Sequence, residues 1–344
     1  MAINLHEKYA KEISTVFTRE SLIAGRLSDN FDFSGVKTVN VVTPITVPMV
    51  DYTRGGVNRY GTPIEMEDVV QEMTLTQDKS FSMTIDKGND ADTNGVKAAG
   101  KMLSLQIAEQ AVPLMDTYCL NKLAHNAGVI TQGEALTREN VCSRITAGTT
   151  ALDNAEVPAD DRTLYITAEG YALLRKSDEF MRCDALLNQS LTKGQVGTYD
   201  GMAVVKVPES RWPKNVNFII VHKSAACAPV KLNDTKLHND PPGISGNLLE
   251  GRQYYDLFVL GARAKGIFVD VDDDATLVEA PVIGDDGKIT CATAGAKIKY
   301  TTDGSDPRYS KSAIEGSTAP MASVVKACAY LEGAFPSGVT TVSK

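Results

Sequence analysis

The chain has 344 residues, of which 43% are hydrophobic and 23% are charged, and these fractions are typical of a folded protein rather than a disordered one. Asp and Glu outnumber Lys and Arg by 43 to 35, so the net charge of −8 disfavours a protein that coats nucleic acid. At about 150 residues per domain, the length predicts two or three domains. No apolar run reaches the roughly 18 to 20 residues of a membrane span, and residues 1–27 lack the apolar core of a secretory signal.

The cysteines and histidines give little support for metal or redox chemistry. No two cysteines form the C-x-x-C pair of a zinc ribbon or a thioredoxin-like site. Single cysteines in a chain without a signal segment are typical of reduced, mostly buried thiols in a protein made in a cytosol. The four histidines are a small supply for metal binding or acid–base catalysis. The cysteines are Cys119, Cys142, Cys183, Cys227, Cys291 and Cys328.

The first segment predicts a helix with one apolar face over residues 5–26, because apolar residues recur there at helical spacing. Acidic and basic residues balance along the rest of this segment. Two interpretations stay open, namely an arm that docks on a neighbouring subunit and an ordinary surface helix. The apolar positions are Leu5, Tyr9, Ile13, Val16 and Phe17.

Residues 37–86 are rich in strand signals. Pro44 and Pro48 confine the first of these signals to a sheet edge or a bend. The segment 51–63 is polar and contains three glycines, which indicates a loop.

Two alternating segments follow that loop, over 69–76 and 81–85. The polar residues 77–80 between them predict a turn, so the two segments would pair as a long two-stranded excursion. Such a hairpin has little core of its own and needs another surface to lie on.

Residues 95–125 predict one long and largely buried helix, because two adjacent apolar stripes run along it at helical spacing. At 1.5 Å per residue this helix would be roughly 46 Å long. Pro113 cannot donate a hydrogen bond to the carbonyl of Glu109, so a kink is expected there. The candidates for its N-cap are Asp92, Thr93 and Asn94.

Helix and strand patterns alternate over 136–229 and predict an α+β body. The Asp200-Gly201 pair can supply the positive φ angles of a two-residue hairpin turn. The segment 231–250 is polar and predicts a loop, whereas 254–269 predicts a long strand that returns across the core. The expected helices span 138–154 and 169–175, and the expected strands span 164–166, 217–221 and a hairpin over 196–207.

Four aspartates between Asp270 and Asp274, followed by Pro281, are typical of a linker. A calcium site is the alternative, but the cluster lacks the spacing of an EF-hand loop, so a solvated linker is favoured. Residues 281–344 show strand signals only and predict a small β-sandwich. Its expected strands span 296–301, 323–330 and 339–342.

The sequence lacks the motifs of common enzymes, with no G-x-S-x-G turn, no P-loop and no G-x-G-x-x-G segment. His125, near the end of the long helix, and His222, at a strand end, are interpreted as structural residues. An isopeptide crosslink from Lys79 or Lys87 would need a carboxylate that becomes buried only when partners meet, and two solvated lysines are the favoured interpretation. We therefore expect no catalytic residue, no cofactor site and no metal site.

Several short segments carry a more specific pattern. Three of them precede the long helix or lie at its start, namely LTQDKSF (75–81), ID (85–86) and DTNG (92–95). Three others follow the helix, namely DGMAVVKVP (200–208), FIIVH (218–222) and GRQYYD (251–256). Together with the order of arm, excursion, long helix, α+β body and returning strand, they resemble the major capsid proteins of tailed bacteriophages, which have the Hong Kong 97-type fold. The resemblance covers about residues 1–270.

The tail carries a second resemblance, through YTTDGSDP (300–307), VKACA (325–329) and residues 333–339. These segments resemble the small immunoglobulin-like module at the C-terminus of chitobiase and β-hexosaminidase enzymes. Ile314 stands near the place of the aromatic residue that usually follows the turn. No catalytic domain accompanies the module, so no glycosidase activity is implied. On a capsid the module would be an outward-facing knob, and sugar or host-surface binding by it is a hypothesis.

The two resemblances imply an α+β chain with the Hong Kong 97-type fold and a small C-terminal immunoglobulin-like β-sandwich. The implied regions are an N-terminal arm (1–35), an extended loop or E-loop (36–90), a peripheral domain with the spine helix (91–135), an axial domain (136–229), a return to the peripheral domain (230–275) and the C-terminal domain (276–344).

The implied function is that of a major capsid protein, a structural and non-enzymatic part of the virion. Copies would form the hexamers and pentamers of an icosahedral shell around double-stranded DNA, with portal and scaffold proteins as partners, after synthesis in the cytoplasm of a bacterial host. The alternative is a glycan-binding surface protein that acts through the tail. The expected assembly contacts are Phe17, Arg54, Arg59 and Lys79.

Overall fold

The computed structural model describes residues 21–31, 33, 36–47, 49–55, 57–63, 65, 68–88, 99–177, 195–320 and 324–343. The predicted cap at 92–94 and most of the predicted N-terminal helix lie outside these residues. The last part of that predicted helix, residues 21–26, consists of turns and bends. Within the described residues, every helix is too short or too polar to traverse a bilayer.

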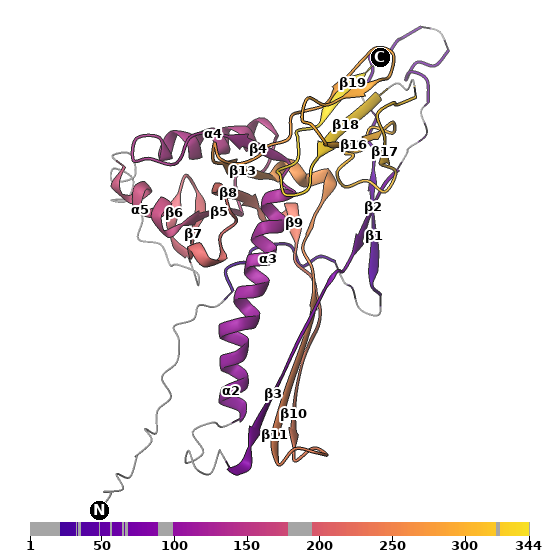
Figure 1. Ribbon diagram of the computed structural model, residues 1–344. Coiled ribbons are helices and arrows are strands. Elements are labelled where there is room, and N and C mark those ends of the chain that lie inside the picture. Colours follow the sequence, from indigo (N-terminus) through magenta and orange to yellow (C-terminus); the bar gives the residue numbers. More distant parts are fainter. Residues whose placement is uncertain are drawn as a thin grey trace, which may run out of the picture.

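A six-stranded mixed sheet forms the body of the molecule, with the order β4-β13-β8-β5-β7-β6 (Figure 1). The pairs β4–β13 and β5–β7 are parallel, and the other pairs are antiparallel. Asp200 and Gly201 have φ angles of 50° and 73°, which confirms the predicted hairpin turn between β6 and β7. The strands are β4 (Val129–Gln132), β5 (Arg162–Thr167), β6 (Gln195–Tyr199), β7 (Met202–Val207), β8 (Val216–His222) and β13 (Ile267–Val271).

Helices cover both faces of this sheet, because its strands alternate between two apolar surfaces. On β5, Leu164 and Ile166 belong to a buried cluster with α4 and α5, whereas Tyr165 belongs to a second cluster with α3. Residues 218–221 of β8 repeat this alternation. The two helices predicted for the body are confirmed. The helices are α3 (Val112–His125), α4 (Val141–Asn154) and α5 (Ala168–Lys176).

The predicted long helix consists of α2 (Ala99–Gln106), a π-helical turn (Ile107–Ala111) and α3, which follow each other without a break. The amide of Val112 donates to the carbonyl of Ile107, five residues earlier. Pro113 has no amide to donate, so the helical ladder is already incomplete at this point. The disturbance expected at Pro113 therefore takes the form of a π turn directly before it. We call this whole unit the spine helix.

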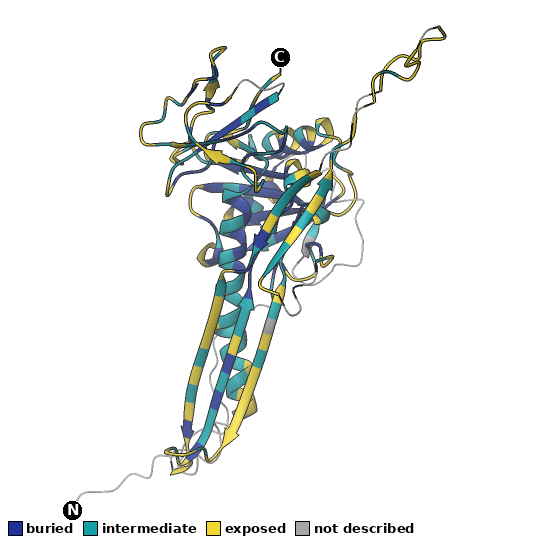
Figure 2. Ribbon diagram, turned by 90° about the vertical axis from the view of Figure 1, so that its right-hand side faces the viewer, coloured by how far each residue is buried: buried dark blue, intermediate teal, exposed yellow. Residues whose placement is uncertain are grey.

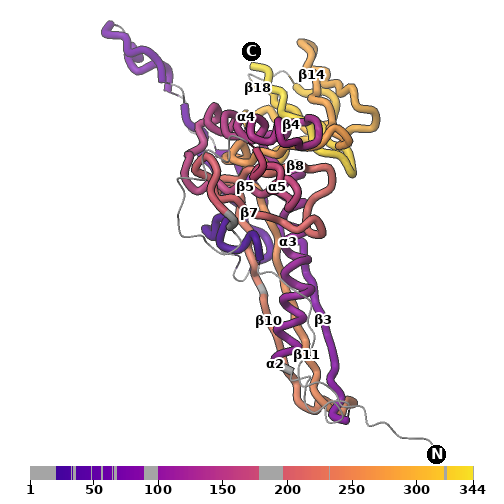
Figure 3. The backbone as a smooth tube through the Cα atoms, turned by 90° about the vertical axis from the view of Figure 1, so that its left-hand side faces the viewer, coloured from indigo at the N-terminus to yellow at the C-terminus, as the bar shows by residue number. Residues whose placement is uncertain are grey.

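A narrow three-stranded ribbon with the order β10-β11-β3 runs beside the spine helix (Figures 1 and 3). The strands are β3 (Gln77–Asp86), β10 (Val230–Asn239) and β11 (Gly246–Tyr255). The predicted turn at 77–80 is wrong, because these residues form the first part of β3. The predicted loop over 231–250 is also wrong, because it is a β-hairpin whose connection holds only residues 240–245. Both errors concern strands that expose polar side chains on both faces.

β1 (Thr38–Pro44) and β2 (Asp68–Thr74) pair antiparallel from Thr38 opposite Thr74 to Pro44 opposite Asp68, and we call this pair of strands the E-loop hairpin because it lies within the segment predicted as an E-loop. The expected pairing of the segments 69–76 and 81–85 is wrong, because β2 pairs with β1 and β3 pairs with β11. The connection between β1 and β2 projects away from the body (Figure 2).

The expected long strand over 254–269 is interrupted. It comprises the end of β11, the short β12 (Phe258–Val259), a 3₁₀ helix (Gly261–Gly266) and the start of β13. β12 pairs with β9 (Ala226–Cys227), and further 3₁₀ turns span Glu209–Arg211 and Lys223–Ala225. The predicted linker is wrong at its first residue, because Asp270 is buried in β13.

The C-terminal module consists of a four-stranded sheet with the order β17-β16-β18-β19 and a two-stranded sheet of β14 and β15. The three strands predicted from the sequence correspond to β16, β18 and β19, and this prediction is confirmed. The strands are β14 (Val282–Ile283), β15 (Ile289–Thr290), β16 (Lys297–Thr301), β17 (Ile314–Glu315), β18 (Val324–Tyr330) and β19 (Thr340–Ser343).

Candidate assembly surface

The E-loop tip, which comprises the described residues between 45 and 65, exposes apolar side chains to solvent. Met49, Val57 and Tyr60 are 100%, 94% and 85% exposed. Tyr52 packs edge-on against Tyr60 with ring centroids 5.0 Å apart, and its half-exposed ring extends the same surface. Several exposed apolar side chains on one projecting loop indicate an interaction site.

The tip has a defined backbone, so its apolar side chains are presented in an ordered way. The amide of Thr53 donates to the carbonyl of Arg59 at 3.2 Å, and the amide of Gly61 donates to the carbonyl of Asn58 at 2.9 Å. Gly61 has a φ angle of 83°, and a Cβ atom at this position would lie 2.7 Å from Cγ2 of Val50. Glycine is therefore required where the tip folds back on itself.

The structure brings two of the four predicted contact residues together. Arg54 and Arg59 are both exposed on the E-loop tip. Lys79 is exposed on a different element, in β3 opposite Gln253 of β11. Phe17 lies outside the described residues. Sequence reasoning missed Met49, Val57 and Tyr60, although apolar residues inside a polar, glycine-rich loop were the available signal.

The root of the E-loop is fixed by the buried carboxylate of Asp256, which is 1% exposed. It accepts hydrogen bonds from the amide and hydroxyl of Thr76, at 2.9 and 2.8 Å, directly after β2. It also accepts a hydrogen bond from the hydroxyl of Tyr118 at 2.8 Å and forms an ion pair with Lys122, both on the spine helix. One carboxylate thus ties the E-loop hairpin to the spine helix where the chain passes from β11 to β12.

The surroundings of Asp256 favour its charged form. Burial by itself would raise the pKa of this carboxyl, but hydrogen bonding and charge from Lys122, with hydrogen bonds from Tyr118 and the amide of Leu257, outweigh it. The pKa of Asp256 is therefore lowered from its ordinary value.

A second connection holds β2 to the body through the side-chain amide of Gln71. Its Nε2 donates to the carbonyl of Val259 at 2.7 Å, and its Oε1 accepts from the amide of Gly261 at 2.8 Å. Beneath it, Met73 and Leu75 are fully buried in a small cluster at the base of the hairpin. The root is therefore rigidly attached, whereas the tip extends into solvent.

Residues 21–28, at the end of the segment predicted as an arm, are attached to the spine helix through Asp116. The hydroxyl of Ser21 donates to this carboxylate at 2.7 Å, and the amide of Leu22 donates to it at 3.0 Å. Arg211 forms an ion pair with the same group at 3.0 Å. Burial raises the pKa of Asp116, and these three partners only partly offset the effect. Leu22, Ile23 and Leu27 are buried in the core beside it.

Asp270 and the two histidines considered in the sequence analysis contact other side chains and the backbone of the same chain. Asp270 forms an ion pair with Arg144 and accepts a hydrogen bond from Asn217 at 2.8 Å. His125 stacks on Phe335 with ring centroids 4.4 Å apart, and Nδ1 of His222 accepts from the amide of Ser224 at 3.2 Å. The part of the chain that the structure describes contains no group of three metal-binding side chains.

The crosslink candidates and the thiols also lie in ordinary surroundings. Lys87 forms an exposed ion pair with Asp240 across the end of the ribbon. Burial raises the pKa of the Cys119 and Cys227 thiols to about 12. Cys142 and Cys328 are buried too, Cys291 is half-buried, and Cys183 lies outside the described residues.

Solved structures of phage chains share this arrangement. A chain from Mycobacterium phage Che8 matches with a TM-score of 0.60 at 17% identity, over 78% of this chain and 98% of its own length. A chain from the capsid structure of the cyanophage P-SCSP1u matches with a TM-score of 0.63 at 12% identity, over 79% and 94%. A chain from the asymmetric unit of the bacteriophage PhiM1 mature capsid matches with a TM-score of 0.60 at 13% identity, over 79% and 93%. The fold is that of phage capsid proteins.

The capsid fold predicted from the sequence is therefore confirmed. About a fifth of this chain has no counterpart in these capsid-fold structures, and the C-terminal module is long enough to account for most of that part. Residues 288–343 match the family model described as "Fn3 associated", which fits the predicted immunoglobulin-like module. A comparison with curated protein sequences gives no match.

The C-terminal module uses its aromatic residues for packing. Tyr300 and Phe335 are 6% and 4% exposed, so their rings are not available to stack on a sugar. Tyr309 and Tyr330 are half-buried, and the ring of Tyr330 lies under the ammonium group of Lys299 at 4.9 Å. Among the four aromatic residues that could have formed a sugar platform, none presents a fully open ring.

Proposed function

We propose that this protein is the major capsid protein of a tailed bacteriophage, and that its copies form the hexamers and pentamers of an icosahedral shell around double-stranded DNA. The observation that carries the proposal is the E-loop tip, which holds exposed apolar side chains on a hairpin with a fixed root. In a subunit that functions alone, such a projection only exposes apolar surface to water and does not stabilise the fold. A subunit surrounded by identical copies can bury it on its neighbours.

The regions implied by the sequence are part of the proposal. They are an arm (1–35), an E-loop (36–90), a peripheral domain (91–135 and 230–275), an axial domain (136–229) and a C-terminal domain (276–344). Arg54 and Arg59 would direct the E-loop tip onto the neighbour, and Phe17 and Lys79 would contact other copies. The role is structural and not enzymatic.

The driving force for assembly is burial of apolar surface. A side chain such as Val57 or Tyr60 contributes about 1.5 to 3 kcal/mol when it is fully buried. The loss of translational and rotational freedom opposes each association and consumes much of this gain. Single contacts are therefore weak, and a closed shell is stable because every subunit contributes the same contacts several times.

The acidic balance of the chain suits a container for DNA, because like charge opposes tight adsorption of the nucleic acid to the wall. The proposed location is the virion, after synthesis in the bacterial host cytoplasm. Portal and scaffold proteins are the further proposed partners.

The test is a pair of charged substitutions at the tip, Met49→Asp and Val57→Asp. Both side chains are almost fully exposed, so the isolated subunit should keep its unfolding temperature within about 2 °C. The wild-type protein should form shells or rings of megadalton mass, and the double variant should remain a small species in sedimentation velocity experiments and in negative-stain images.

The matched control is Val282→Asp, which places the same charge at a 66% exposed valine of the C-terminal module. This variant should assemble like the wild type. Normal shells from the tip variant would contradict the proposed role of the E-loop tip, and a wild-type protein that stays monomeric at all concentrations would contradict the capsid function itself.

A further inference from the structure

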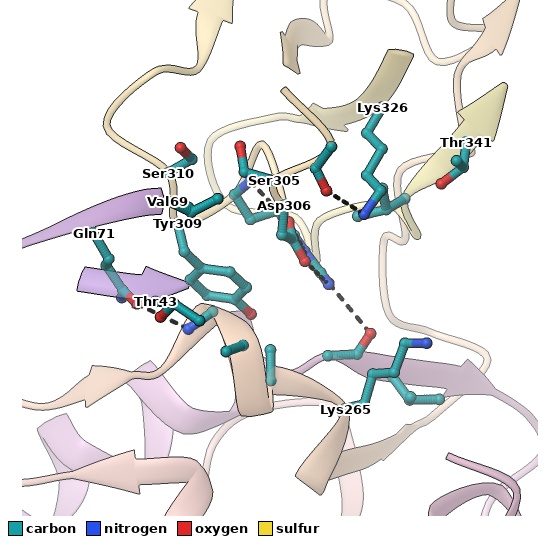
Figure 4. Close-up of a pocket in the computed structure, with 18 residues that line it drawn as sticks. Thr43, Val69, Gln71, Lys265, Ser305, Asp306, Tyr309, Ser310, Lys326 and Thr341 are labelled. Carbon is teal, nitrogen blue, oxygen red and sulfur yellow. Dashed lines mark hydrogen bonds and ion pairs between the residues drawn. The ribbon is translucent and has the colours of Figure 1, made fainter. Parts of the chain in front are cut away.

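One segment of the C-terminal module, residues 303–312, contacts both the body and the E-loop hairpin, and we call it the docking loop. It begins in the turn motif that distinguishes the tail sequence. Figure 4 shows part of this loop between the E-loop strands and the body. The three parts surround a cavity of about 470 Å³, lined by Thr43 and Val69 of the E-loop hairpin, Lys265 of the body and Lys326 of the module.

The docking loop is held in shape by its own side chains. Asp303 accepts hydrogen bonds from the amide of Ser305 at 3.0 Å and from the hydroxyl of Ser312 at 2.5 Å. Asp306 accepts from the amide of Arg308 at 2.9 Å and forms an ion pair with its guanidinium at 2.8 Å. The loop is therefore preorganised rather than shaped by what it touches.

On one side, the docking loop binds the end of the spine helix. Nη1 of Arg308 donates to the carbonyls of Ala127 and Gly128, at 3.0 and 3.3 Å. The hydroxyl of Tyr309 donates to the carbonyl of Asn126 at 2.6 Å. These carbonyls directly follow α3, where backbone acceptors lack partners within the helix. The loop thus supplies donors to three consecutive carbonyls of the segment that connects α3 to β4.

On the other side, the docking loop pairs with β2 at the root of the E-loop. The amide of Lys311 donates to the carbonyl of Val70 at 3.0 Å, and Gln71 and Ser310 form an antiparallel bridge. The ammonium group of Lys311 lies 2.8 Å from a carboxylate oxygen of Glu72, and this ion pair lowers the pKa of Glu72. The loop therefore acts as a short additional strand next to β2.

Beside the cavity, the body and the docking loop are in close contact. A Cβ atom at Gly261 would lie 3.0 Å from Cβ of Tyr309, so the 3₁₀ helix of the body and the docking loop are in close contact. The same glycine donates its amide to Gln71 of β2. Body, E-loop and module meet at one point, and a movement of one of them breaks contacts with the other two.

We propose that the C-terminal module is an intramolecular brace that fixes the direction in which the E-loop leaves the body. A module that is braced in this way can still face outward on a shell. The brace acts within a single subunit, and only its benefit for assembly rests on the proposed capsid function. It consists of a preorganised loop that donates hydrogen bonds to the carbonyls directly after the spine helix and pairs with β2.

Hydrogen–deuterium exchange of the full-length, unassembled subunit tests the brace. Arg308→Ala removes the bonds to the helix end and does not touch β1 or β2. It should nevertheless speed the exchange of the β1 and β2 amides by about tenfold, because the hairpin loses its support. Lys311→Glu breaks the contact with Glu72 and should speed exchange in the same strands by about threefold.

Two controls keep the result decisive. Lys297→Glu makes the same charge change within the module, where Lys297 lies 3.7 Å from Glu315, and should leave the E-loop strands unchanged. The double variant Glu72→Lys with Lys311→Glu should restore slow exchange by reversing the ion pair. If Arg308→Ala prevents folding, the exchange rates of Lys311→Glu and of the double variant are sufficient to test the brace.

The brace is refuted if β1 and β2 exchange at the wild-type rate while the docking loop itself exchanges faster. That result would leave the capsid proposal untouched, because shell formation is measured separately with the tip variants. Conversely, a wild-type protein that never assembles would refute the capsid function without affecting the exchange result.

Discussion

At the scale of single residues, Asp256 shows how a buried charge can hold three segments together. Its carboxylate accepts hydrogen bonds from Thr76 between β2 and β3, from Tyr118 of the spine helix and from the amide of Leu257 directly before β12. A buried charge is costly without partners, and removing its charge leaves Lys122 without a counterion in a half-buried position.

Asp256→Asn should lower the free energy of unfolding by about 2 to 4 kcal/mol at pH 7, because the ion pair with Lys122 and charged hydrogen bonds are lost. Chemical denaturation of the unassembled subunit measures this change. The matched control is Asp234→Asn, which removes a carboxylate from an exposed pair with Lys236 at 3.4 Å and should cost no more than about 0.5 kcal/mol.

The pH dependence of the same variant gives a second measurement. Because the folded-state pKa of Asp256 is lowered, its charge contributes stability above the ordinary aspartate pKa of about 4. This contribution is lost as the pH falls through the lowered pKa. The difference in unfolding free energy between wild type and variant should therefore shrink below about pH 4. A gap that is equally large at pH 7 and pH 3 would contradict the assignment.

At the scale of elements, α4 lies unusually close to the central sheet, and Gly148 makes this possible. A Cβ atom at this position would lie 2.8 Å from Cδ1 of Ile220 and 3.0 Å from the ring of Phe268. The glycine is in the middle of a helix, where alanine is normally the better residue. Its presence therefore reflects helix–sheet packing.

Gly148→Ala should lower the free energy of unfolding by about 1 to 3 kcal/mol, because the added methyl group overpacks the layer between α4 and the sheet. Gly100→Ala in α2 is the matched control, since nothing lies within 4 Å of its Cβ position, and it should raise stability by about 0.5 to 1 kcal/mol. Equal effects of the two substitutions in denaturation experiments would argue against close packing at Gly148.

The elements that the sequence predicts well have a pattern that is visible over a few consecutive residues. β5, α4 and the turn at Asp200 and Gly201 all carry a local pattern, either apolar periodicity or a residue pair suited to positive φ. Residues 77–80 of β3 and most of β10 carry none, because their side chains are largely exposed on both faces of the ribbon. Alternation of apolar and polar residues arises only where one face of a strand is buried.

The candidate surface was predictable only in part for a related reason. Arg54 and Arg59 are conspicuous in a polar loop, whereas Met49 and Val57 look like ordinary loop residues until their exposure is known. The docking of residues 310 and 311 on β2 joins positions about 240 residues apart in the sequence. No local pattern specifies such a contact, so the sequence does not predict it.

At the scale of the whole molecule, the C-terminal module and the body share a core. Phe335 of the module belongs to the same buried cluster as Leu123 of the spine helix and Val269 of β13. It also stacks on His125 at the end of α3. Units that share buried side chains in this way unfold together rather than one after the other.

Calorimetry of the unassembled wild-type subunit should therefore show one unfolding transition. Phe335→Ala removes the shared side chain, so it should lower the free energy of unfolding by about 3 to 5 kcal/mol and separate a second transition for the module. Val282→Ala, at an exposed position of the module, should change neither the number of transitions nor the stability by more than about 0.5 kcal/mol. Two transitions in the wild type would show that the module is energetically independent.

During synthesis on the ribosome, β3 is made long before β11, the strand with which it pairs. Asp86 pairs with Gly246 and Gln77 with Tyr255, so the partner of β3 is synthesised only after a long intervening stretch. At about 5 to 20 residues per second, β3 leaves the exit tunnel roughly 8 to 35 s before its partner does. Throughout that interval the nascent chain exposes an unpaired strand edge and an uncovered apolar tip to other nascent copies on the same polysome, and such surfaces favour aggregation before folding is complete.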